Sequence, residues 1–199
     1  MKTITATLLL LLTSTSLFAQ SNSVIVRVAV PQYSGDRASV AGEGDLPFTL
    51  SSNLGYGIGF AHSFSPRFSA AFDVMRLNPD VRTTVDGVRL DAGSMTMTPL
   101  TAIARIHSRY AYAGAGVAYV TTGDLRSDDL DLTGIGSVSV DNELTYVLNA
   151  GLSIPAGKSM HIDFDARWLP MNVDVSSAPG RGSLKFNTLI LGAGLGWKF

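Results

Sequence analysis

The last twelve residues constrain the fold most, because large apolar residues and mostly small residues alternate there without a break. One set is apolar and ends in two aromatic residues: Leu189, Leu191, Ala193, Leu195, Trp197 and Phe199. The other set is rich in glycine: Thr188, Ile190, Gly192, Gly194, Gly196 and Lys198. A period of two residues predicts a β-strand. The oily face and the glycine-rich face together indicate lipid on one side and a crowded interior on the other.

Seven earlier segments repeat this alternation, so the chain is expected to be all-β with eight strands. The seven segments are residues 23–30, 54–61, 68–75, 99–107, 110–120, 146–154 and 161–168. Which face of the 99–107 segment is the outer one is ambiguous. Strands of roughly ten residues suit a tilted crossing of a bilayer. Although 46% of the residues are hydrophobic, no stretch beyond the N-terminal segment is long enough for a membrane helix.

The lengths of the connections favour a membrane barrel over a soluble sandwich. Short turns are expected near Ser65, Ser108 and Gly157, whereas residues 31–52, 78–96, 121–142 and 172–182 form long polar connections. Short turns at one end and long loops at the other are typical of outer-membrane barrels. The predicted fold is therefore an eight-stranded antiparallel up-and-down transmembrane β-barrel, with short periplasmic turns and long extracellular loops.

The N-terminal segment predicts export. A positive start at Met1 and Lys2, an apolar run and small residues before Gln20 are typical of a cleaved signal peptide, here residues 1–19. The barrel then covers residues 20–199, and the expected location is the bacterial outer membrane. The chain has no cysteine, so disulfides do not stabilise it. A net charge of −1 gives no reason to expect a nucleic-acid partner.

Five charged residues are predicted to point into the barrel: Arg27, Asp73, Asp163, Asp165 and Arg167. A carboxylate pair beside an arginine is one arrangement that catalysis uses. The favoured interpretation is an ion-pair network, because an unpaired buried charge would cost several kcal/mol. At least one of Arg27 and Arg167 should then contact one of the three carboxylates. No catalytic residue, cofactor or metal site is predicted, since none of the three histidines has ligand spacing with another histidine or an acidic cluster.

The aromatic C-terminus predicts a role in assembly. Trp197 and Phe199 resemble the terminal strand signal that the barrel-assembly machinery recognises, and an aromatic end also fits the interfacial girdle of such barrels. The expected partners are therefore outer-membrane lipids and the assembly machinery. The oligomeric state is not predicted.

Several segments resemble the OmpW family of small outer-membrane proteins. They are VRVAVP from Val26, TPLTAIARI from Thr98, YAYAGAGVAYV from Tyr110, and the closing pair LNAGLSIPAGKSMHIDFDARWL and LILGAGLGWKF. The resemblance implies an eight-stranded, non-enzymatic barrel with a narrow channel for passive passage of small hydrophobic molecules. Leu54, Tyr56 and Leu100 are candidates for its lining. Two alternatives stay open: a non-conducting structural or surface-interaction barrel with adhesive or receptor loops, and a lipid-A-modifying enzyme.

Overall fold

The computed structural model describes residues 21–40, 44–85, 88–123, 139–177 and 180–199. The predicted signal peptide lies outside these residues. No helix in the described part of the chain is long and apolar enough to cross a membrane.

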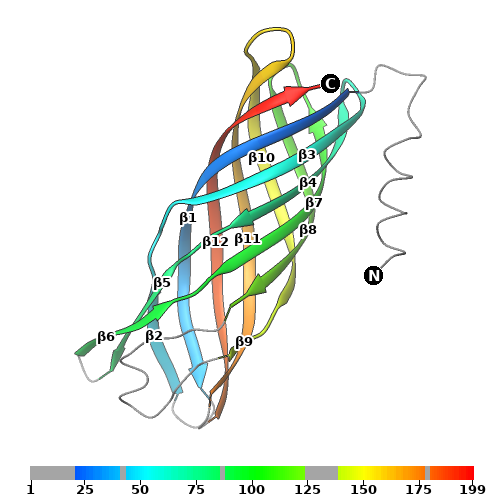
Figure 1. The fold of residues 1–199 in the computed structure, drawn as a ribbon. Coiled ribbons are helices and arrows are strands. Elements are labelled where there is room, and N and C mark those ends of the chain that lie inside the picture. Colours follow the sequence, from blue (N-terminus) through cyan, green and yellow to red (C-terminus); the bar gives the residue numbers. More distant parts are fainter. Residues whose placement is uncertain (1–20, 41–43, 86–87, 124–138, 178–179) are drawn as a thin grey trace, which may run out of the picture.

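Eight antiparallel strands close into a barrel, as predicted (Figure 1). Around the wall the order is β1, β3, β4, β7, β8, β10, β11 and β12, and β12 returns to β1 through a long ladder that includes Val26↔Leu195. The strands are β1 (Ser21–Val40), β3 (Gly55–Ser65), β4 (Phe68–Arg76), β7 (Met97–His107), β8 (Ala111–Thr122), β10 (Glu143–Pro155), β11 (Met160–Ser177) and β12 (Gly180–Lys198). Closure pairs both edges of the sheet, as a bilayer requires.

The long connections contain more strand than the sequence analysis expected. β1 and β12 run well beyond the predicted strands, and four further strands form at the same end: β2 (Gly44–Leu50), β5 (Asp80–Val85), β6 (Val88–Ser94) and β9 (Ser139–Val140). β5 and β6 form a hairpin, and β2 pairs with both β1 and β5. Cross-strand pairing satisfies the backbone groups of these polar segments, which therefore extend the wall instead of forming irregular loops.

The alternation along each strand separates an apolar outer surface from the interior. On β1, Val26 and Val28 are half exposed while Arg27 between them is 2% exposed. Strands β4 and β12 repeat the pattern, with Phe72 and Leu191 exposed beside buried Asp73 and Ile190. A continuous outer layer of large apolar side chains is stable only against lipid.

The interior changes in character along the barrel axis. Next to the short turns it is polar, and a layer of charged residues follows. Beyond that layer, away from the turns, the inward residues are apolar: Met75, Leu77, Met97, Ile103, Val120, Val147, Leu169, Met171, Val173, Phe186 and Ile190. Strand β11 shows the change most directly, because its inward face runs from Asp163, Asp165 and Arg167 to Leu169 and Met171. We call these two parts the charged layer and the apolar half.

The wall is interrupted beside the apolar half. The β1–β3 ladder ends at Ala29↔Gly55, and the β1–β2 ladder resumes at Arg37↔Pro47 in the same register. Residues 30–36 and 48–54 face each other between these ladders, and no backbone pairing joins them in the described structure. Pro31 has no N–H to donate to a ladder. Residues 48–50 pair instead with β5 on their other side.

A shorter interruption separates β10 from β11. Their ladder ends at Leu148↔Trp168, and β11 next pairs with β9 at Val175↔Val140. Here the Thr145 hydroxyl donates a hydrogen bond of 2.6 Å to the Pro170 carbonyl, so a contact still spans the opening.

Candidate functional site

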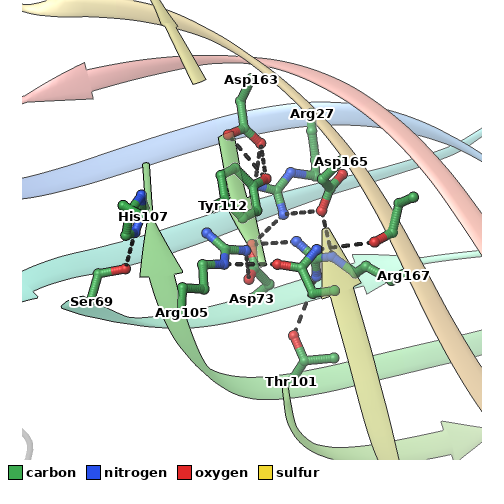
Figure 2. Close-up of polar contacts among 12 residues, drawn as sticks. Arg27, Ser69, Asp73, Thr101, Arg105, His107, Tyr112, Asp163, Asp165 and Arg167 are labelled. Carbon is green, nitrogen blue, oxygen red and sulfur yellow. Dashed lines mark hydrogen bonds and ion pairs between the residues drawn. The ribbon is translucent and has the colours of Figure 1, made fainter. Parts of the chain in front are cut away.

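The charged layer is centred on Arg27, which projects inward from β1 (Figure 2). Its guanidinium nitrogens lie 2.5 Å from Asp73 on β4, 3.3 Å from Asp163 and 3.5 Å from Asp165, both on β11. All four side chains are at least 95% buried. Because the carboxylates come from opposite parts of the wall, Arg27 links strands that share no backbone hydrogen bonds.

Two further arginines balance the layer. Arg167 donates to Asp165 at 2.6 Å and lies 3.1 Å from Asp73, and Arg105 on β7 lies 3.8 Å from Asp73. Arg105 also donates to the Asn149 amide oxygen at 2.9 Å, and Arg167 donates to the Thr101 hydroxyl at 3.3 Å. Three arginines therefore face three aspartates. The structure brings the five predicted interior charges together in one network and adds Arg105 to it (Figure 2).

Glycines on neighbouring strands make room for these large side chains. A Cβ on Gly59 would collide with the Asp73 carboxylate, and a Cβ on Gly192 would collide with that of Asp165. Each glycine is paired directly with the aspartate that it accommodates, across β3–β4 and β11–β12. The glycine-rich inner faces noted in the sequence thus provide the volume that the charged layer occupies.

Between the charged layer and the short turns lies a polar pocket of about 230 Å³, which opens toward the turns. Tyr112 lies between the two, because its hydroxyl donates to Asp163 at 3.2 Å while its ring stacks under Arg105 at 4.6 Å. Ser69 and His107 also line the pocket, with the serine oxygen 2.6 Å from Nε2 of the histidine. In the described structure no carboxylate is hydrogen-bonded to the other ring nitrogen of His107.

The predicted lining residues lie on the wrong side of the wall. Leu54, Tyr56 and Leu100 are 65%, 58% and 40% exposed on the outer surface, so the prediction that they line a channel is wrong. Tyr56 and Leu100 share the outer face of the alternation with their partners Val28 and Val74. The inward positions beside Tyr56 are Gly55 and Gly57. Leu54 is one of the unpaired residues of the interruption, but its side chain is exposed on the outer surface.

The predicted assembly residues are exposed at the end of the last strand. Trp197 and Phe199 lie on the outer face, and Phe199 exchanges two backbone hydrogen bonds with Asn22 at the start of β1. The terminal residue therefore takes part in closing the barrel. Its recognition by the assembly machinery stays a prediction.

Arg105, Tyr112 and the Ser69–His107 pair are site residues that were not predicted from the sequence. On β7 the outward residues include Ala102 and Ala104 while Ile103 points inward, so hydrophobicity does not separate the faces. The register between β7 and β8 distinguishes the inner face of β7 from the outer one, because Arg105 pairs with Gly114 and His107 pairs with Tyr112. A glycine opposite a large polar residue is the available signal.

Comparisons with known proteins agree with this architecture. The model of the OmpW family matches residues 16–199. The outer membrane protein OprG from Pseudomonas aeruginosa is 15% identical, with a TM-score of 0.78 over 92% of this chain and 96% of OprG. The outer membrane protein AlkL, studied in lipid bilayers, is 17% identical, with a TM-score of 0.65 over 94% of this chain and 93% of AlkL. A search of curated protein sequences finds no match.

Proposed function

The chain belongs to the OmpW family of bacterial outer-membrane barrels, and from that premise we propose that it passes small apolar compounds from the cell exterior into the membrane. The observation that carries the proposal is the division of the interior into a charged layer and an apolar half. The short turns face the periplasm, so the apolar half lies on the extracellular side. We propose no catalytic role for any residue of the barrel.

The apolar half supplies a suitable surface for such compounds. Met75, Met97 and Met171 contribute flexible thioether side chains to its packing. Methionine adapts its shape to irregular apolar partners, so a small hydrocarbon can displace these side chains without exposing polar groups. The arginines and aspartates that are buried in the described structure all belong to the charged layer and not to the apolar half.

The charged layer closes the straight route to the periplasm. An apolar molecule that entered it would separate Arg27 and Arg167 from their carboxylates without replacing any ion pair, which costs several kcal/mol. The interrupted wall between residues 30–36 and 48–54 offers a route of lower cost, because buried Pro31 and Leu50 adjoin it and lipid lies outside. The proposed path therefore leaves the barrel sideways.

Closing the interruption should stop the passage. The register of the two flanking ladders, continued along the strands into the interruption, sets Gln32 opposite Ser52, and both residues are exposed. Because the chain has no cysteine, a Gln32→Cys/Ser52→Cys variant carries a single designed disulfide. Vesicles with lipopolysaccharide in their outer leaflet would report the transfer of an apolar fluorophore by stopped flow. We expect the oxidised variant to transfer no faster than protein-free vesicles, and reduction to restore the wild-type rate.

A matched control carries the cysteines where the wall is already paired. Val28 and Tyr56 are paired on the outer face, next to the last pair of the β1–β3 ladder. The Val28→Cys/Tyr56→Cys variant should therefore transfer the fluorophore equally well when oxidised and when reduced. Equal transfer by oxidised and reduced Gln32→Cys/Ser52→Cys would place the exit elsewhere. A wild-type protein no faster than bare vesicles would favour the sealed, surface-interacting barrel, for which the filled interior is the supporting observation.

A further inference from the structure

The polar pocket at the periplasmic end has no part in the proposed passage of apolar compounds, yet it carries uncompensated positive charge. Arg109 and Lys198 both line it. In the described part of the chain no carboxylate lies within ion-pair distance of either residue. The Arg109 guanidinium lies 5.0 Å from the centre of the Tyr110 ring, which leaves its donors available to a ligand.

The single carboxylate in the pocket wall does not neutralise these cations. Asp163 accepts hydrogen bonds from the Tyr112 hydroxyl at 3.2 Å and from Arg27 at 3.3 Å. Both contacts tie it to the charged layer, where three arginines already balance three aspartates. The pocket therefore attracts anions.

Two buried side chains that line the pocket have nitrogens without a hydrogen bond. His161 is 2% exposed, and its Nδ1 makes no hydrogen bond. One terminal nitrogen of Arg105, at 3.8 Å from Asp73, likewise makes none. A buried polar group without a partner costs about 1–3 kcal/mol, so a ligand rich in acceptor oxygens would gain from meeting these groups.

We propose that this pocket binds a phosphate group, either free or as the ester of a small polar alcohol. Cationic donors come from Arg105 on β7, Arg109 in the β7–β8 turn and Lys198 on β12, and the hydroxyls of Ser23 and Ser153 add neutral donors. Donors on several sides suit the oxygens of a tetrahedral phosphate, whereas one arginine fork is enough for a planar carboxylate. A pocket of about 230 Å³ also leaves space for a small substituent on the phosphate.

The three histidines of the chain provide a direct measurement. His107 and His161 line the pocket, whereas His62 lies outside it and contacts Asn22. With histidine-labelled protein in a non-ionic micelle at low ionic strength, inorganic phosphate should shift the imidazole resonances of His107 and His161 with one saturating curve. The His62 resonance should not move. No shift of His107 or His161, or an equal shift of all three, would overturn the proposal.

Paired variants separate a site from general attraction. Arg109→Gln/Lys198→Gln should weaken phosphate binding at least about tenfold, since it removes two charged donors. Arg67→Gln/Lys158→Gln removes the same charge from exposed turns at the same end, outside the pocket, and should bind as the wild type does. Equal weakening in both variants would contradict a defined site. Retarded migration of unheated samples on detergent gels would check that both variants fold.

Two further samples identify the source of the phosphate. In nanodiscs of zwitterionic lipid, glycerol phosphate should shift His107 and His161 as inorganic phosphate does. If anionic phosphatidylglycerol nanodiscs shift both resonances before any addition, the occupant is a lipid headgroup. If they shift only when glycerol phosphate is added, the occupant is a soluble ester. Failure of every phosphate compound here, with apolar transfer intact, would reject this site and leave the proposed function standing.

Discussion

Replacing Arg27 with methionine is expected to lower the free energy of unfolding by about 3–5 kcal/mol, because removing one partner from a buried ion pair leaves uncompensated charge. Arg27 contacts Asp73, Asp163 and Asp165 within 3.5 Å, and all four side chains are buried. Methionine keeps most of the side-chain volume, so the decrease in the free energy of unfolding comes from the missing charge and not from a cavity. Urea unfolding in lipid vesicles, followed by the fluorescence of the two tryptophans, measures it.

Two variants show whether the effect comes from the network. Arg67→Met removes an arginine from an exposed turn and should change the free energy of unfolding by no more than about 0.5 kcal/mol. Arg27→Met/Asp73→Asn removes a cation and an anion that contact each other, so its loss should be smaller than the sum of the two single losses. A loss below about 1 kcal/mol for Arg27→Met would mean that the charged layer does not stabilise the barrel.

Leu191→Arg should destabilise the barrel by about 2 kcal/mol, because the cost of a lipid-facing arginine rises from about 0–1 kcal/mol near the interface to about 2–4 kcal/mol at the bilayer midplane. Leu191 is exposed on the outer face of β12 and lies within the apolar band that runs from Leu189 to Trp197, one outward position from its end at Leu189. Its neighbours in the ladder are Val30 and Ala166, neither of which can pair with the charge. The same urea titration in vesicles measures the loss.

The matching interfacial variant is Met160→Arg. Met160 begins β11, is also exposed, and pairs with Trp197 at the end of the band. An arginine there reaches the headgroups, so the expected cost is about 0–1 kcal/mol. Equal costs at the two positions would contradict the assignment of the outer face to lipid.

How much the sequence predicts depends on what each face of a strand contacts. β12 was predictable because lipid meets one face and a glycine-lined interior meets the other, so hydrophobicity alternates cleanly. β7 was not, because Ala102 and Ala104 face outward while Ile103 packs inside. Strands β2, β5 and β6 lie outside the eight strands that were predicted to cross the membrane, and their polar residues suggested loops. Backbone pairing, which leaves little trace in composition, forms these strands.

The interior was predictable only where it is charged. Arg27, Asp73, Asp163, Asp165 and Arg167 interrupt apolar patterns, and burial leaves such residues few positions other than beside one another. The apolar half lacks this signal, since Leu169 and Met171 are as hydrophobic as an outward residue. Continuing the inward alternation of β11 past Arg167 would have found both. Leu54, Tyr56 and Leu100 are hydrophobic, which on this fold favours the lipid face.

In the proposed function, the charged layer closes the barrel to water and ions while the apolar half passes hydrophobic molecules sideways. Planar-bilayer recording of the wild-type protein tests it most directly. The buried side chains of the charged layer fill the narrow interior of this eight-stranded barrel at that level, so the current should stay at the level of the bare lipid in symmetric salt. Sustained ohmic steps that scale with salt concentration would show a continuous aqueous pore and contradict the claim.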